Sequence, residues 1–392
     1  MKTASVMKRR DLLAIAAILA TTTSLGAAET VQLSDTVIRR SQLSLGDPAR
    51  FKRVFDRAKR GETIRIGFIG GSITAGAIAS APANGYAARV SDWWRKTFPK
   101  ARIEMVNAAI GGTGSLYGSL RVEQDFLSHD LDAVIIEFAV NDAWTDQEPF
   151  ESLVRHVLAS SLDIAVMLLF MVYDHGGNEQ EWQQKIGAYY DLPMVSFRDA
   201  VWPELQSGRL KVKDILVDIV HPNDTGHRIT AELVTTQLDS LRNAEAIGAS
   251  SPALPSPLYG NRFQNAHWIG ATRLKPQNSN GWTLTRTDDP PPHALGPDIW
   301  LTEPGVETPL SLDWQGTGLV AVMWLENGDT NPVTLEIDGK PAQIITTQTQ
   351  PRRNVVTVAL DLPKGKHSFS INRKLGIDAR PPFGLYGIGI IP

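Results

Sequence analysis

The stretch Ile64-Arg65-Ile66-Gly67-Phe68-Ile69-Gly70-Gly71-Ser72-Ile73-Thr74-Ala75-Gly76 joins an apolar run to two glycines and a serine. The β-branched residues of the run indicate a strand, and the apolar spacing from Tyr86 to Phe98 predicts a later helix. Glycines permit a tight turn at the end of the strand, where the hydroxyl of Ser72 can stand clear of the backbone. Open α/β sheets bind ligands at the carboxyl ends of their strands, so Ser72 is a candidate nucleophile.

Strands and helices alternate on either side of this stretch. We predict strands at Ile64–Ile69, Arg102–Asn107, Ala133–Phe138, Ile164–Met171 and Leu192–Phe197. We predict helices near Tyr86–Phe98, Leu116–Ser128, Phe150–Ser160, Glu179–Tyr190 and Gly226–Leu241. The strand cores are apolar without alternation, as expected of a parallel sheet covered on both faces. The pattern therefore predicts a doubly wound α/β domain.

The pattern changes after residues 250–258, which are rich in proline and serine and favour an extended linker. Strand-like runs then follow one another without helical spacing, and Asp338-Gly339 and Lys364-Gly365 are typical of hairpin turns. We predict an antiparallel β-sandwich over residues 259–392. Its tryptophans could line a sugar-binding face, although core or edge positions are the more usual ones: Trp268, Trp282, Trp300, Trp314 and Trp324.

Composition narrows the classes of function. The 392 residues include 39 Lys+Arg and 42 Asp+Glu, a net charge of −3, with no basic cluster beyond the first ten residues. We therefore expect no nucleic-acid partner. The chain contains no cysteine, which excludes disulfides, thiolate metal sites and a cysteine nucleophile. His129, His156 and His175 lack partner carboxylates at metal-binding spacing, so we expect neither a metal nor a cofactor.

The amino terminus has the pattern of an export signal. Lys8-Arg9-Arg10 precedes an apolar run from Leu12 to Ala20, and Gly26-Ala27-Ala28 offers a cleavage site after Ala28. The paired arginines resemble a twin-arginine signal, and the run is too short to span a bilayer with ease. We predict that residues 1–28 are removed and that residues 29–249 form the catalytic domain of a periplasmic or secreted protein without a membrane span.

Three further segments carry the groups that a serine nucleophile requires. They are Asn107–Thr113, Phe138–Asp142 and Asp218–Asn223, each at the carboxyl end of a strand or in a loop on that side. Acyl transfer from serine needs a base, a carboxylate that orients the base, and donors for the developing oxyanion. His221 and Asp218 supply the base and the carboxylate. The backbone N–H groups of Ser72 and Gly112 and the side-chain amide of Asn141 are candidate oxyanion donors.

These four segments, in this order, resemble the sequence blocks of the SGNH (GDSL-type) hydrolase superfamily over about residues 64–235. The resemblance implies a flavodoxin-like sheet, a catalytic Ser72, oxyanion donors at Gly112 and Asn141, and an Asp-x-x-His pair at Asp218 and His221. Two positions depart from the pattern of the superfamily. Gly71 stands where many members have aspartate, and Ala139 stands where a glycine is common. Neither position carries a reacting group.

The sequence thus predicts an exported serine esterase that hydrolyses an ester, expected to be O-acetyl, on a carbohydrate. Two alternatives stay open: an O-acyltransferase that uses the same acyl-enzyme, and a polysaccharide-binding protein without catalysis. His227 is the nearest rival base, but it follows two residues that we expect to cap a helix, Asn223 and Asp224. We therefore expect His227 to have a helix-terminal role.

Overall fold

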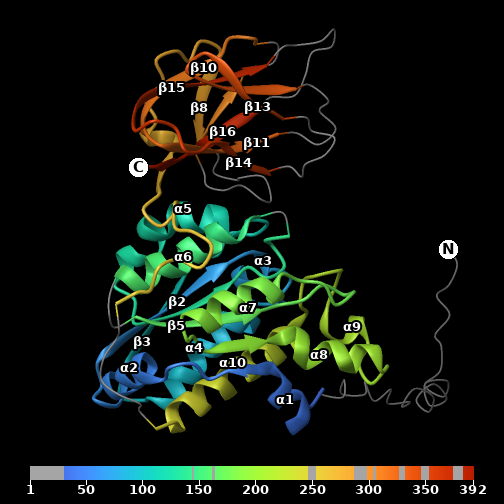
Figure 1. Ribbon diagram of the computed structural model, residues 1–392. Coiled ribbons are helices and arrows are strands. Elements are labelled where there is room, and N and C mark those ends of the chain that lie inside the picture. The colour runs from blue at the N-terminus through green and yellow to red at the C-terminus, as the bar shows by residue number, and fades with distance from the viewer. Residues whose placement is uncertain are drawn as a thin grey trace, which may run out of the picture. The chain divides into compact units, whose positions relative to one another are not determined.

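The computed structural model describes residues 31–143, 145–160, 164–245, 253–286, 298–302, 306–325, 332–345, 353–373 and 383–392. The predicted export signal and residues 250–252 of the predicted linker lie outside these ranges. An α/β part is followed by a part made mostly of strands (Figure 1). No helix within the described ranges has both the length and the apolar character needed to cross a membrane.

The α/β part is built on a six-stranded sheet in the order β1-β6-β5-β4-β2-β3. Its strands are β1 (Gln42–Ser44), β2 (Thr63–Gly70), β3 (Arg102–Asn107), β4 (Ala133–Glu137), β5 (Ala165–Phe170) and β6 (Met194–Ser196). Neighbouring strands pair in parallel, except that β1 pairs antiparallel with β6. Without the short β1, which the sequence did not predict, the order is that of a flavodoxin-like sheet. The predicted fold class is confirmed.

Helices cover both faces of this sheet (Figure 1). Their bounds are α1 (Asp35–Ser41), α2 (Ala49–Lys59), α3 (Ser72–Ala75), α4 (Tyr86–Thr97), α5 (Ser115–Asp125), α6 (Gln147–Ser160), α7 (Gln180–Tyr189), α8 (Phe197–Gln206), α9 (Val212–Ile215) and α10 (Asp224–Asn243). Helices α2, α4 and α10 pack together, as do α5, α6 and α7. The predicted helices match α4, α5, α6, α7 and α10. Helix α8 escaped prediction because it follows β6 without a loop and contains Pro203, which normally breaks a helix.

The strand cores show why the sheet has helices on both faces. Val134 and Ile136 of β4 belong to a buried cluster that includes Phe150 of α6 and Ile186 of α7. Ile135 lies between them and is equally buried, with 3% of its surface exposed. Because successive strand side chains point to opposite faces, Ile135 must be covered from the other side. An apolar run without alternation therefore requires two layers of helices.

The carboxyl-terminal part is a β-sandwich of two antiparallel sheets. One sheet has the order β10-β15-β12-β13, and the other has the order β14-β11-β16-β9-β8 with β7 also paired to β16. The strands are β7 (His267–Gly270), β8 (Trp282–Arg286), β9 (Asp298–Thr302), β10 (Leu310–Gly316), β11 (Gly318–Trp324), β12 (Val333–Ile337), β13 (Lys340–Ile345), β14 (Arg353–Ala359), β15 (Gly365–Arg373) and β16 (Gly384–Ile391). Residues from both sheets form one core cluster.

Of the two predicted hairpin turns, one is right and one is wrong. Asp338 and Gly339 both have positive φ values, 51° and 72°, and join the paired strands β12 and β13. Lys364-Gly365 joins β14 to β15, which lie in different sheets. The chain crosses between the sheets there, after Asp361 with a φ of 57°. The local turn signal was present, but it does not specify which strands pair.

Most tryptophans of the sandwich are structural. Trp282 and Trp314 belong to the sandwich core, with 6% and 5% of their surface exposed. Trp268 is also buried, in a second cluster. Trp300 and Trp324 are partly buried and pack against these two clusters. The core or edge interpretation therefore applies to all five tryptophans.

The chain between the two parts contacts helix α6 closely. Glu151, a fully buried residue of α6, accepts hydrogen bonds from the backbone N–H groups of Leu258 and Tyr259, each at 2.6 Å. Glu148 of the same helix accepts from the Arg262 guanidinium, with Nη2 to Oε2 at 2.6 Å. The described residues of the predicted linker, 253–258, form neither helix nor strand. The domain boundary at residues 249 and 250 stays a prediction.

A second contact joins α5 to the sandwich. Tyr117 and Leu120 of α5 share a buried apolar cluster with Trp268 and Tyr386 of the sandwich. The rings of Tyr117 and Trp268 meet edge to face, with centroids 5.1 Å apart. Leu120 also occupies the space that a side chain at Gly389 would need. The two parts therefore share buried surface.

Candidate active site

Ser72 lies where the first part of the chain turns from strand to helix. β2 ends at Gly70, Gly71 precedes the short helix α3, and Ser72 is the first residue of that helix. Gly76 ends α3 with a φ of 83°, a conformation that glycine adopts without strain. The turn thus presents the Ser72 side chain at the carboxyl end of β2, as the sequence predicts.

His221 and Asp218 form a hydrogen-bonded chain with Ser72. His221 Nε2 lies 2.8 Å from Ser72 Oγ, and His221 Nδ1 lies 2.7 Å from Asp218 Oδ2. Partial burial of Asp218 alone would raise its pKa, but hydrogen bonds from the backbone and ring of His221 lower the pKa below the ordinary value. Asp218 is therefore held as the carboxylate, the form that accepts a hydrogen bond from the Nδ1–H group of the imidazole ring.

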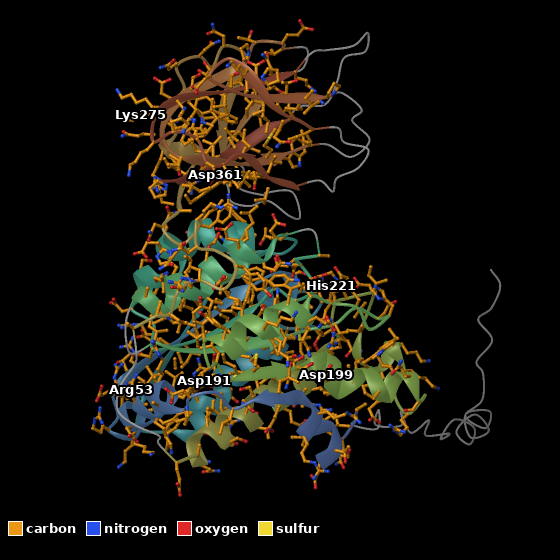
Figure 2. All side chains as sticks on the ribbon, in the orientation of Figure 1. Arg53, Asp191, Asp199, His221, Lys275 and Asp361 are labelled. Carbon is orange, nitrogen blue, oxygen red and sulfur yellow. The ribbon has the colours of Figure 1, made fainter. Side chains whose placement is uncertain are left out.

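The loop that carries this pair is fixed at both ends by hydrogen bonds. Its His221 is labelled in Figure 2. The Val217 N–H donates to the carbonyl of His221 at 2.9 Å. Asn223 caps α10 through a hydrogen bond from the Gly226 N–H at 3.0 Å. The three-residue offset between Asp218 and His221 thus closes a local turn, in which Asp218 Oδ1 also accepts from the His221 N–H at 2.7 Å.

The two other predicted site residues line the same cavity. Gly112 and Asn141 surround a hollow of about 700 Å³ together with Ser72 and His221. Gly112 has a φ of 68°, which favours glycine. Asn141 follows β4, the neighbour of β2 in the sheet. The cavity therefore lies at the point where the strand order reverses, which is where such sheets bind ligands.

Two glycines allow the close packing around Ser72. A Cβ atom on Gly111 would lie 3.3 Å from the Cβ of Ser72. A Cβ atom on Gly71 would overlap with the side-chain amide of Asn141, whose Nδ2 would be only 2.8 Å away. Glycine at position 71, where many members of the superfamily have aspartate, thus has a steric reason. The Asn141 amide occupies the space that a side chain at this position would need.

Comparison with known proteins identifies the segment of the chain that contains these residues. Residues 68–229 match the model of the GDSL-like lipase/acylhydrolase family. This segment is a GDSL-like domain. No curated protein sequence matches the chain.

Solved structures extend the likeness to the sandwich. A two-domain esterase described as active on acetylated mannans shares 29% sequence identity with this chain, with a TM-score of 0.81 over 92% of this chain and 98% of that one. A crystal of such an esterase grown with mannopentaose gives a TM-score of 0.80 at the same identity and coverage. The predicted superfamily is confirmed, and the chain is a carboxylic ester hydrolase by its domain and its structural neighbours.

The sequence analysis did not predict a buried carboxyl group in the GDSL-like domain close to the candidate nucleophile Ser72. Glu137, the last residue of β4, is fully buried, and its Oε2 accepts a hydrogen bond from Thr74 of α3 at 2.9 Å. The Thr74 hydroxyl also lies 2.8 Å from the hydroxyl of Tyr86. Burial raises the pKa of Glu137 to about 8. The sequence feature that could have indicated this buried group is an acidic residue at the end of an apolar strand.

Asp142 connects two loops of the GDSL-like domain. Its carboxylate accepts from the Ser115 N–H at 2.7 Å and from Gln183 Nε2 at 2.9 Å. Ser115 begins α5 directly after the glycines at residues 111, 112 and 114, so Asp142 ties the Asn141 loop to the Gly112 loop. Burial raises the pKa of Asp142 to about 7. Asp142 thus contacts the first residue of α5 and a residue of α7.

His227 does not contact Ser72. It is buried in α10, where its Nδ1 accepts from the Tyr86 N–H at 3.4 Å and its Nε2 lies 3.3 Å from the carbonyl oxygen of Ala77. These contacts agree with the predicted helix-terminal role. Among the described residues, no cluster of three or more His, Asp or Glu side chains suits a metal ion.

Proposed function

We propose that this protein is an exported serine esterase that removes acetyl groups from a polysaccharide. The observation that carries the proposal is the hydrogen-bonded chain from Asp218 through His221 to Ser72, at 2.7 and 2.8 Å. These distances suit proton transfer from the serine hydroxyl to the imidazole. The choice of acetyl esters of a polysaccharide, with acetylated mannans first, rests on the two-domain esterase that resembles the whole chain.

In the proposed reaction, His221 Nε2 removes the proton from Ser72 Oγ as that oxygen attacks the carbonyl carbon of the ester. The carbonyl oxygen becomes negative and accepts hydrogen bonds from the N–H groups of Ser72 and Gly112 and from the amide of Asn141. Asp218 holds the ring in the tautomer that accepts at Nε2, and it stabilises the imidazolium.

The tetrahedral intermediate then breaks its bond to the alcohol oxygen. His221 donates its proton to this oxygen, the alcohol leaves, and the acetyl group remains on Ser72. Water attacks the acyl-enzyme with His221 again as base. Acetate leaves and the proton returns to Ser72 Oγ. An acyltransferase would differ only here, by placing a sugar hydroxyl where water attacks.

The test is an acetate-release assay with purified mature protein and a panel of acetylated polysaccharides. Wild-type protein should release free acetate without an added acceptor, and Ser72→Ala should not. Ser128→Ala, a change to an exposed serine of another segment, is the matched control and should behave like wild type. Transfer of acetyl to added sugar without free acetate would favour the acyltransferase. Binding without turnover in either protein would contradict an esterase.

A further inference from the structure

Ile78 adopts a backbone conformation that its side chain disfavours. Its φ is 67°, in the left-handed region. The four other non-glycine residues with positive φ in the described part of the chain are all aspartates: Asp130, Asp191, Asp338 and Asp361. Aspartate tolerates this region because its short polar side chain bonds locally, whereas a β-branched residue there is an outlier.

Burial of the Ile78 side chain does not offset the free-energy cost of this backbone conformation. Ile78 is 53% exposed, so about half of its surface stays in contact with water. The Ala79 N–H donates to the Gly76 carbonyl at 3.2 Å, which makes Ile78 the third residue of a four-residue turn. Glycine or asparagine is the usual residue at that place when φ is positive. Neither packing nor turn chemistry therefore accounts for an isoleucine.

Contacts on both sides of the turn hold it in place. The Ala77 N–H donates to the carbonyl of Ser72 at 3.0 Å. After the turn, the Ser80 N–H donates to Asp224 Oδ1 at 2.8 Å, and Asn84 Nδ2 donates to Asp224 Oδ2 at 3.0 Å. Strain of this kind persists where the surrounding structure over-determines it, and it concentrates at active sites.

Ile78 lines the same cavity as Ser72 and His221. We propose that Ile78 is a specificity-determining residue whose exposed side chain contacts the alcohol part of the ester. On the proposed function, on which this inference rests, that part is a sugar ring. Its C–H groups would pack against the isoleucine.

The contacts of the turn indicate that Ile78 lies near the alcohol part of the ester rather than near its acyl part. The turn is fastened to Asp224 and His227, which lie in the first turn of α10, directly after the His221 loop. The alcohol oxygen must come within reach of His221 Nε2 to receive its proton. A side chain on the His221 side of the cavity therefore lies beside the leaving alcohol.

The experiment compares two ratios of kcat/KM in wild type, Ile78→Gly and Ile78→Asn. The first ratio, an acetylated mannooligosaccharide over methyl acetate, varies the alcohol. The second ratio, methyl butyrate over methyl acetate, varies the acyl group. Asp130→Gly is the matched control, because Asp130 has the same left-handed backbone with a φ of 52° and does not line the cavity.

We expect the alcohol ratio to fall about tenfold in both Ile78 variants, at the low end of the effect of one lost apolar contact in a pocket. The acyl ratio should stay within about twofold of wild type. Ile78→Gly should melt at the wild-type temperature or above it, since glycine relieves the disfavoured backbone. Asp130→Gly should keep both ratios.

An unchanged alcohol ratio, or an acyl ratio that rises about tenfold, would overturn the inference. The second outcome would assign Ile78 to the acyl group. Failure of the proposed function would look different: wild-type protein would hydrolyse methyl acetate but release nothing from any acetylated sugar. That result would remove the inference before any variant is compared.

Discussion

The side-chain amide of Asn141 fills the space that a side chain at Gly71 would need. The two residues follow neighbouring strands, β4 and β2, and they meet beside Ser72. Position 71 therefore controls where the proposed oxyanion donor lies, although a glycine has no side chain to act in the reaction.

Gly71→Ala should lower the kcat for ester hydrolysis by about a hundredfold, because displacement of one preorganised donor typically costs that much. Asn141→Ala should have a similar effect. Since both changes remove the same donor, the double variant should be no worse than Asn141→Ala alone. Steady-state kinetics on an aryl acetate measure all three. Additive losses would show that Gly71 acts independently of Asn141.

Ser72→Ala should reduce turnover by a factor on the order of 10⁶ without lowering the melting temperature, because in the proposed reaction its hydroxyl forms the acyl-enzyme and its side chain fills no core position. Hydrolysis of an aryl acetate and thermal melting measure the two effects. A serine-directed phosphonate should label wild-type protein at Ser72, as read by peptide mass spectrometry. Labelling at another serine would reject the assignment.

Asp218→Asn tests the orienting carboxylate. The amide does not accept the hydrogen bond from the ring Nδ1–H group in the same way, so the tautomer of His221 that accepts at Nε2 is no longer favoured. We expect kcat to fall by a factor on the order of 10⁴ with little change in KM. Full activity in this variant would mean that another group orients His221.

Glu137 should make stability depend on pH. Its pKa is raised from 4.5 to about 8 in the folded protein, so folding favours the protonated form. Protonated Glu137 contributes its full stabilisation below the pKa that this residue has in the unfolded chain. The stabilisation is lost as the pH rises through the pKa of Glu137 in the folded protein. The free energy of unfolding should therefore fall by on the order of a few kcal/mol between about pH 5 and pH 9.

Glu137→Gln should remove most of this fall and still accept the hydrogen bond from Thr74. Urea unfolding at several pH values measures the difference. Asp142, whose pKa is raised to about 7, contributes in the same direction and remains in the variant, so a smaller dependence should persist. An unchanged pH dependence would contradict a neutral Glu137.

A chain ending at Ala249 should be poorly soluble, because removal of the sandwich uncovers the apolar face of α5. Tyr117 and Leu120 have 2% and 1% of their surface exposed in the full chain. A truncated chain that also carries Tyr117→Ser and Leu120→Ser should recover solubility, as measured by ultracentrifugation of the lysate. A soluble and active truncated chain without these changes would show that the α/β part folds without the sandwich.

The sequence determined the features that depend on neighbouring residues. The parallel sheet follows from apolar strands without alternation, and the Ser72 turn follows from two glycines after a strand. The Asp218–His221 pair could be predicted because a three-residue offset closes within one local turn. The resemblance of four segments then indicated which distant residues meet.

Only the tertiary structure decided the features that depend on which segments pack together. The turn at Lys364-Gly365 was misassigned because strand pairing is a long-range choice that a turn signal does not contain. Glu137 and Asp142 could not be placed from sequence, because burial and partners such as Thr74 and Gln183 come from other elements. The left-handed φ of Ile78 is likewise held by Asp224, 144 residues beyond Ser80 in the chain, and no local pattern encodes that contact.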